Sequence, residues 1–439
     1  MKRVAAPHHR RPPRGGAARP RGQRGIAALV TVLVLFFIVA LVAAYASRNL
    51  IFEQRTAANQ YRSTAAIEAA EAGLEWALAM LNHGRIDAAC ATSSSTADTS
   101  FRQRYLNIDA STGSIAVRKT STGADLLPSC VFDGTGRSCS CPSDGAPTLA
   151  APSDSAVHPA FRIRFKPLPG TPSQPGLVQV ESVACTRLDP TCLTFPGTPG
   201  AVLGVGNEGR AYVTALVGLT GGATSPPAAA LTALGRVALA GGAIHGDVAV
   251  QAGGTVSTDP SMTLTRSPGS PGSPAVLASQ AALSALSPER FFAAQFNLWS
   301  QTFRQQPAAV VLDCSSSSCD AATLRQRIAL NPGRPIWVDG SLAIDSGGNI
   351  GSADSPVLLV VTGSVAVTAS DATIHGLLYV QTADWPDAGA LQVQGAVAVE
   401  GDLDTGTPQI AYDPALINRL RLSTGSFVLV PGSWHDFYP

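Results

Sequence analysis

The chain has 439 residues, which is enough for two or three domains. Its formal net charge of +1 gives no global field that would attract nucleic acid or an acidic partner. Only 14% of the residues are charged, whereas Gly and Pro number 42 and 32, so the composition favours a glycine-punctuated β protein with a membrane segment over a helical cytosolic enzyme.

The first 25 residues are basic and contain no acid, and an uncharged apolar run from Ile26 to Ala46 follows them. As a helix this run would measure about 31 Å, which matches the hydrocarbon core of a bilayer. Since basic flanks stay in the cytoplasm, the residues after Ser47 are expected on the far side of the inner membrane. The basic residues are Lys2, Arg3, Arg10, Arg11, Arg14, Arg19, Arg21 and Arg24.

The helix is expected to continue without a break to Asn82, because residues 50–82 contain no Pro and are rich in Ala, Leu and Glu. Small and apolar residues follow one stripe of this continuation, and "NHG" at Asn82–Gly84 ends it. A cleaved secretory signal is the alternative, since "AAYAS" offers a small-x-small site. A signal of that kind has no reason to join an amphipathic helix.

Gly25 followed by "IAALV", the apolar run and "AAIEAAEAGLEWAL" resemble the N-terminal domain of PilX-type type IV pilus assembly proteins, which are minor pilins. The resemblance implies cleavage after Gly25 by a prepilin peptidase and N-methylation of Ile26. It also implies a single-pass inner-membrane protein with periplasmic domains that later reaches the pilus surface. Its implied partners are other minor and major pilins, the inner-membrane assembly platform and the peptidase. The residues expected to pack inside the filament are Leu29, Val30, Leu33, Phe36, Phe37 and Leu41.

One position departs from the pattern of major pilins, which have Glu where this chain has Val30. That carboxylate is thought to pair with the N-terminal ammonium of a neighbouring subunit. A subunit without it leaves a neighbour's buried ammonium unpaired, which is costly inside a filament. Val30 therefore favours a priming or tip position, either in a type IV pilus or, as an alternative, as the tip pseudopilin of a type II secretion-like system.

Residues 83–220 are expected to form a small pilin-like β domain on which the amphipathic half of the helix packs. Alternation of apolar and polar residues predicts antiparallel strands at 114–120, 161–167, 177–185 and 209–219. The resemblance to PilX-type proteins implies that the last of these strands closes the sheet. Residues 221–230, "GGATSPPAAA", are typical of a linker.

The chain has eight cysteines and no Cys-x-x-Cys pair, which argues against zinc or thioredoxin chemistry. Cys185 with Cys192 and Cys314 with Cys319 are local pairs in polar loops, so we expect disulfides formed in an oxidising compartment. The pairing among the remaining four is open. These are Cys90, Cys130, Cys139 and Cys141.

Residues 231–439 repeat short apolar runs that end at Gly, such as "VDGSLAI", "VTGSVAV" and "VQGAVAV". Repeats of this kind predict a β-solenoid. An insertion near 273–334 separates the first repeat from the others, and it contains a helix that begins with Ser287 as cap and Pro288 as first residue. The expected fold class is α+β, with a long N-terminal helix, an antiparallel sheet and a solenoid.

The phrase Ile-His-Gly occurs twice, at His245 and His375. A paired histidine site is one interpretation, but no Cys or Glu cluster accompanies either residue. We therefore expect a repeated structural corner in which the imidazole hydrogen-bonds the backbone of a neighbouring strand. No metal and no cofactor are expected.

A membrane-tethered enzyme acting on polysaccharide is the remaining alternative, because parallel β-helices host such enzymes. It would need clustered acids, and the candidates lie at turns, where Asp is common for backbone reasons. The expected function is therefore binding, with assembly of a pilus and adhesion as its purposes, and not catalysis. The acids are Asp339, Asp345, Asp354, Asp371, Asp384 and Asp387, and a possible aromatic patch comprises Trp299, Trp337, Trp385 and Trp434.

Overall fold

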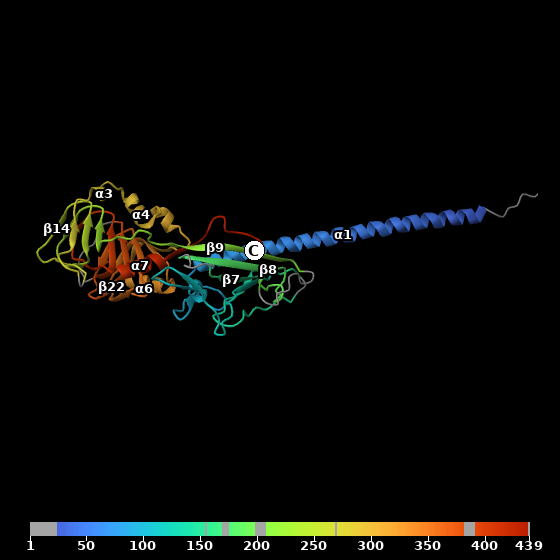
Figure 1. Cartoon of the computed structure of the whole chain (residues 1–439), viewed down its shortest axis with the longest axis horizontal. Coiled ribbons are helices and arrows are strands. Elements are labelled where there is room, and N and C mark those ends of the chain that lie inside the picture. Colours follow the sequence, from blue (N-terminus) through green and yellow to red (C-terminus); the bar gives the residue numbers. More distant parts are fainter. Residues whose placement is uncertain are drawn as a thin grey trace, which may run out of the picture. The chain divides into compact units, whose positions relative to one another are not determined.

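The computed structural model describes residues 24–153, 156–168, 175–197, 208–267, 270–381 and 391–437. The chain forms two compact units, Met1–Tyr61 and Arg62–Pro439. A long apolar helix and a largely β region make up the fold, which is therefore α+β as predicted (Figure 1).

Helix α1 spans Arg24–Leu81 and begins and ends close to the predicted limits. In the first unit its residues from Ile26 onward are exposed on every side. In the second unit the helix becomes amphipathic, because small residues recur every three or four positions and are buried. A Cβ atom at Gly73 would lie 2.5 Å from the Ser182 hydroxyl, so only glycine lets the helix approach the sheet this closely. The buried stripe includes Ala66, Ala69, Ala70, Leu74, Ala77 and Leu81.

The sheet that covers this half of α1 is antiparallel, with strand order β26-β9-β8-β7-β5-β6. Phe161, Ile163 and Phe165 alternate along one strand and join the same core as the helix. The prediction that the strand at 209–219 closes the sheet was wrong, because β26 from the far end of the chain pairs beyond it. The strands are β5 (Ser129–Phe132), β6 (Arg137–Ser140), β7 (Ala160–Lys166), β8 (Leu177–Cys185), β9 (Arg210–Gly221) and β26 (Gly425–Leu429).

Short elements lie between α1 and this sheet in the sequence. The strand predicted at 114–120 is shorter, and it pairs with β3 in a separate two-stranded sheet. Ser100 caps helix α2 through a reciprocal pair of hydrogen bonds with Gln103, which fixes the start of the helix. The elements are β1 (Arg85–Ile86), β2 (Thr99–Ser100), α2 (Phe101–Tyr105), β3 (Leu106–Ile108) and β4 (Ile115–Val117).

Residues 231–411 form a series of parallel strand pairings, which we call the parallel ladders. Their inward-facing Val, Ile, Leu and Ala side chains make one continuous apolar core. The strands are β10 (Leu231–Ala233), β11 (Val237–Leu239), β12 (Ala243–His245), β13 (Val248–Ala252), β14 (Val256–Thr258), β15 (Thr263–Thr265), β16 (Ala275–Leu277), β17 (Val310–Asp320), β18 (Ile336–Ile344), β19 (Gly348–Ile350), β20 (Val357–Val361), β21 (Val365–Val367), β22 (Ala372–Val380), β23 (Gln392–Val399), β24 (Leu403–Gly406) and β25 (Gln409–Ala411).

The order of strands in the ladders is not their order in the sequence. The first strand, β10, pairs with β13 on one side and with the late strand β23 on the other. The chain therefore enters the ladders in the middle and runs outward to β16. It resumes at the opposite edge with β17 and returns inward to meet its own beginning.

The segment that joins the two edges crosses the outer surface of the ladders. Aromatic residues of α4 and α5 pack on Trp337 and Tyr379. Ser287 caps α4 and Pro288 is its first residue, as predicted, but the predicted single helix breaks at Asn297, whose backbone is left-handed. The helices of this segment are α3 (Ala281–Ser284), α4 (Pro288–Phe296) and α5 (Ser300–Arg304). Two more helices lie outside it: α6 (Ala321–Leu330) follows β17, and α7 (Pro414–Ser423) follows β25.

The repeated glycines mark a bend at the same register in neighbouring strands. Gly376 of β22 lies opposite Gly395 of β23, and their φ angles are +152° and +138°. A Cβ atom on Gly395 would lie 2.0 Å from the carbonyl oxygen of Gly376. His375 and Gln394, which precede them, are therefore equivalent positions of one repeated corner.

Candidate functional site

The first part of α1 presents a continuous apolar surface. The six residues predicted to pack in a filament are between 47% (Leu33) and 71% (Leu41) exposed, and Val30 is 53% exposed. Among the described residues, one helix, Ile26–Leu81, is long and apolar enough to cross a membrane. Such a surface is unstable in water and needs lipid or other helices around it.

The predicted processing point lies at the start of this helix. Helix α1 begins at Arg24, so Gly25 is within its first turn, and the side chain of Ile26 is 70% exposed. The first charged residue after Ile26 is Arg48. The uncharged part of the helix is thus continuous from the predicted cleavage point to Ser47.

At its other end α1 is tied to a distant part of the chain. The Asn82 side-chain amide donates to the carbonyl oxygen of Phe427 at 2.8 Å, and the Phe427 N–H donates back to Asn82 Oδ1 at 2.8 Å. This exchange imitates the pairing of two strands. It satisfies backbone groups that are buried and would otherwise lack partners.

Arg102 of α2 lies against the same end of α1 and is 2% exposed. Its guanidinium donates to the carbonyl oxygens of Leu81, Gly333 and Gly425 at 2.8, 3.0 and 3.1 Å. A cation at a helix C-terminus is favourable because the last carbonyls carry partial negative charge. Burial, with a smaller effect of Arg334, lowers the pKa of the Arg102 guanidinium.

A second polar cluster is buried on the sheet surface opposite α1. Glu181 is 1% exposed and is paired with Arg164 at 2.5 Å and with Lys166 at 2.8 Å. The hydroxyl of Tyr212 donates to Glu181 Oε1 at 2.8 Å, and burial followed by the charge of Glu181 raises the pKa of this tyrosine. Each of these side chains is paired with Glu181, so the cluster has a structural role.

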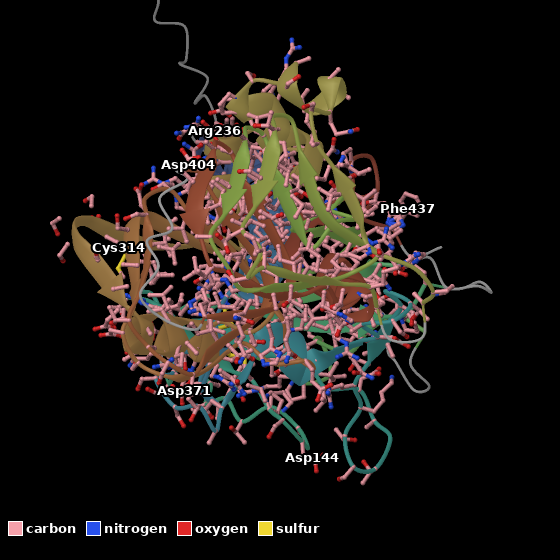
Figure 2. All side chains as sticks on the ribbon, turned by 90° about the vertical axis from the view of Figure 1, so that its left-hand side faces the viewer. Asp144, Arg236, Cys314, Asp371, Asp404 and Phe437 are labelled. Carbon is pink, nitrogen blue, oxygen red and sulfur yellow. A yellow bond between two sulfur atoms is a disulfide. The ribbon has the colours of Figure 1, made fainter. Side chains whose placement is uncertain are left out.

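The eight cysteines form four disulfides. The two local pairs, Cys185–Cys192 and Cys314–Cys319, join as expected. The four cysteines left open in the sequence pair as Cys90–Cys141 and Cys130–Cys139. Cys314 lies at the periphery of the ladders in Figure 2, on the edge strand β17.

The two histidines of the repeated phrase lie apart from any candidate metal site. His245 Nδ1 contacts the hydroxyl of Thr265 at 2.8 Å, a side chain and not the backbone that was expected. His375 Nδ1 is buried and has no hydrogen-bond partner within the described part of the chain. In the same residues no three His, Cys, Asp or Glu side chains gather closely enough to hold a metal ion.

Three of the acids considered for catalysis have separate partners. Asp339 pairs with Arg304 at 2.5 Å, Asp354 pairs with Arg419 at 3.3 Å, and Asp345 accepts from the Ala321 N–H. Asp384, Trp385 and Asp387 lie outside the described residues. Of the other tryptophans, Trp337 is buried beneath α4 and α5, whereas Trp299 and Trp434 are exposed.

Sequence reasoning missed the junction around Asn82 and Arg102. Asn82 was interpreted only as part of a helix stop. Arg102 lies in a polar stretch that offers no periodic signal. Their partners, Gly333, Gly425 and Phe427, are more than 200 positions away, and a single sequence contains no sign of such pairings.

Comparison with known proteins bears on the N-terminal part of the chain. The PilX N-terminal family model matches residues 24–75. No curated protein sequence matches the chain. The solved structure of the competence-associated pilin ComZ from Thermus thermophilus is similar over 86% of this chain and 98% of its own, at 12% identity and a TM-score of 0.23, a likeness too weak to define the fold. The family match therefore characterises residues 24–75 of this chain, which are similar to the PilX N-terminal family.

Proposed function

We propose that this chain is a minor pilin that takes part in the assembly of a type IV pilus. The observation that supports this most directly is the helix α1, which is exposed up to Tyr61 and uncharged from Ile26 to Ser47, and which packs on an antiparallel sheet after Tyr61. One continuous helix of this kind can lie in the inner membrane before assembly and among other pilin helices afterwards. Its partners are then other pilins, the assembly platform and the prepilin peptidase.

Each part of the chain then has its own role in a minor pilin. Residues 1–25 are a leader removed by the peptidase, and residues 26–82 form the membrane and filament helix. Residues 83–220 are the pilin-like β domain, to which β26 adds an edge strand, and residues 221–230 are a linker. The mature N-terminus at Ile26 is N-methylated.

Within the predicted domain 231–439, the parallel ladders of residues 231–411 are proposed to be a β-solenoid that presents a surface for adhesion. The support is the parallel pairing of short strands, the bends at equivalent glycines and a continuous apolar core. A solenoid offers an extended surface without needing a catalytic centre.

Val30 supports a position at the end of the filament. A subunit with valine there cannot pair with a neighbour's N-terminal ammonium, and that deficit is tolerated where no neighbour follows. The same residue suits the tip pseudopilin of a type II secretion-like system, so the filament in which the protein is found distinguishes the two.

Mass spectrometry of the N-terminus of protein extracted from membranes tests the proposal. A mature chain that begins with methylated Ile26 is expected. Gly25→Ala should block this processing, whereas the neighbouring Gly22→Ala should not. A mature chain that begins after Ala46 would contradict the proposal, because the filament helix would then have been removed.

A further inference from the structure

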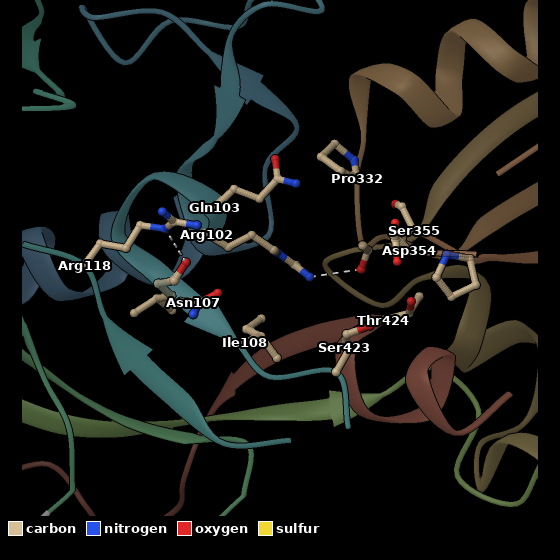
Figure 3. Close-up of a pocket in the computed structure, with 14 residues that line it drawn as sticks. Arg102, Gln103, Asn107, Ile108, Arg118, Pro332, Asp354, Ser355, Ser423 and Thr424 are labelled. Atoms are coloured by element: carbon tan, nitrogen blue, oxygen red, sulfur yellow. Dashed lines mark hydrogen bonds between the residues drawn. The ribbon is translucent and has the colours of Figure 1, made fainter. Parts of the chain in front are cut away.

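A polar cavity of about 220 Å³ lies between the α2–β3 segment on one side and, on the other, the loop before β18, the loop before β20 and the end of α7 (Figure 3). Arg102 and Gln103 of α2 and Asn107 of β3 line one side, together with Arg118. The other side is formed by Pro332, Gly333 and Ser355, and by Ser423 and Thr424 at the end of α7. In Figure 3 the side chain of Arg102 reaches across the cavity to the carbonyl of Gly333.

The charge of the cavity is not balanced by the protein. No carboxylate in the described ranges forms an ion pair with Arg102, Arg118 or the nearby Arg334. Asp354 is the one acid among the residues that line the cavity, and it pairs with Arg419 at 3.3 Å. Arg334 lies close enough to lower the pKa of Arg102 by charge repulsion, so like charges are gathered here.

Hydrogen-bond donors also remain available. A guanidinium has five N–H groups. Arg102 directs its Nε and Nη1 groups at carbonyl oxygens, while Nη2 has only a 3.5 Å contact with Asn82 Oδ1. Arg118 donates from Nε to the Leu106 carbonyl at 3.2 Å, and its Nη groups have no partner among the residues described.

We infer that this cavity binds a small oxyanion, the phosphate or carboxylate group of a small ligand. Two guanidinium groups, one of them nearly fully buried, match the planar and bidentate geometry of such groups. The amides of Gln103 and Asn107 and the hydroxyls of Ser423 and Thr424 supply further polar contacts around it. An anion here offsets a positive charge that the fold holds out of water without a counter-charge.

Arg118 tests the inference without disturbing the fold, because it is exposed and forms one hydrogen bond to the backbone, whereas Arg102 also holds α1 to β26. The probe is inorganic phosphate, titrated into the full chain in detergent at constant ionic strength, with binding followed by calorimetry. Arg118→Gln is expected to weaken binding at least tenfold. Arg290→Gln removes an exposed arginine that has no ion pair in the described chain, so it should leave the affinity unchanged.

Two further arms complete the experiment. Malonate in place of phosphate shows whether carboxylate or phosphate is preferred, and either preference supports an oxyanion site. Arg118→Lys retains the charge, so it should bind at least threefold more tightly than Arg118→Gln even if both variants are less stable than the natural chain. Equal affinities for the natural chain and Arg118→Gln, or no saturation below about 10 mM phosphate, would overturn the inference.

Discussion

Asn82 and Phe427 exchange two hydrogen bonds of 2.8 Å across 345 positions of the sequence. The first of these residues ends the long helix and the second lies in the last strand of the sheet. Between them the chain forms the whole of the parallel ladders. A side-chain amide therefore holds the helix to a strand that is among the last parts of the chain to be made.

Replacement of Asn82 by alanine should destabilise the second unit. The Phe427 N–H and carbonyl are buried and would lose their partners, at a cost of about 3 kcal/mol in the free energy of unfolding. Chemical denaturation of the full chain in detergent, followed by tryptophan fluorescence, measures the change. Asn349 is exposed in β19, and Asn349→Ala should change the free energy of unfolding by less than about 0.5 kcal/mol. Equal effects of the two substitutions would contradict the role given to Asn82.

The disulfides should differ in how much they add to the free energy of unfolding, according to the length of chain that each one closes. Cys90 and Cys141 are 51 positions apart, whereas Cys314 and Cys319 are 5 apart. Loop-closure entropy predicts that the free energy of unfolding falls by about 4 kcal/mol in the double variant Cys90→Ser and Cys141→Ser. In the double variant Cys314→Ser and Cys319→Ser it should fall by about 2 kcal/mol. Denaturation of both variants beside the natural chain gives the ranking, and the reverse order would count against the entropic argument.

Glu400 should make stability fall as the pH rises. Burial raises the pKa of this carboxyl above its ordinary value of 4.5, and Glu289 adds to the effect, while hydrogen bonds from Tyr379 and Gln381 oppose it. The folded chain therefore holds the proton more tightly than the unfolded chain. The contribution of Glu400 is fully present below pH 4.5 and is lost as the pH rises through the raised pKa.

In the natural chain the Tyr379 hydroxyl donates to Glu400 Oε1 at 2.7 Å. Glu400→Gln should remove the pH dependence of stability while keeping an oxygen that accepts this hydrogen bond. The free energy of unfolding of the variant, relative to the natural chain, is expected to increase between about pH 4 and pH 7. Denaturation curves at a series of pH values measure it. Glu75→Gln on the exposed face of α1 is the matched control. If the free energy of unfolding of Glu400→Gln, relative to the natural chain, did not change with pH, the expectation would be wrong.

Val30→Glu should change where the protein is found in a filament. The new carboxylate can pair with the N-terminal ammonium of a neighbour, so the variant should be tolerated along the shaft and not only at an end. Immunogold labelling of isolated filaments measures the distribution. Val30→Gln adds polarity without charge and should keep the natural distribution, and labelling that is alike for all three chains would show that this position does not decide placement.

Elements with a strong local signal could be predicted from the sequence. The apolar run and its amphipathic continuation gave helix α1 to within a few residues, because each residue's environment repeats along one axis. Alternation predicted β7, β8 and β9 for the same reason. The capping of α4 by Ser287 depends on two adjacent residues and was equally visible.

Features set by distant pairings could not be predicted. Residues 425–429 look like any short apolar strand, and only the assembled fold shows that they extend the sheet beside β9. The repeats predicted short strands but not their neighbours, and the pairing of β10 with β23 depends on how the two strands pack in the assembled fold. Arg102 needed the three carbonyls that surround it to be recognised as part of a junction.

The outermost strands of the ladders, β16 and β17, are consecutive in the sequence and are joined by the segment that contains α3, α4 and α5. Both outer edges of the ladders are thus formed by residues in the middle of the sequence. Duplication of a repeat near this connector would lengthen the domain without displacing the strands that meet at its centre. Deletion from the C-terminal end, by contrast, would remove β26 and α7 and would then reach the strands that meet at that centre.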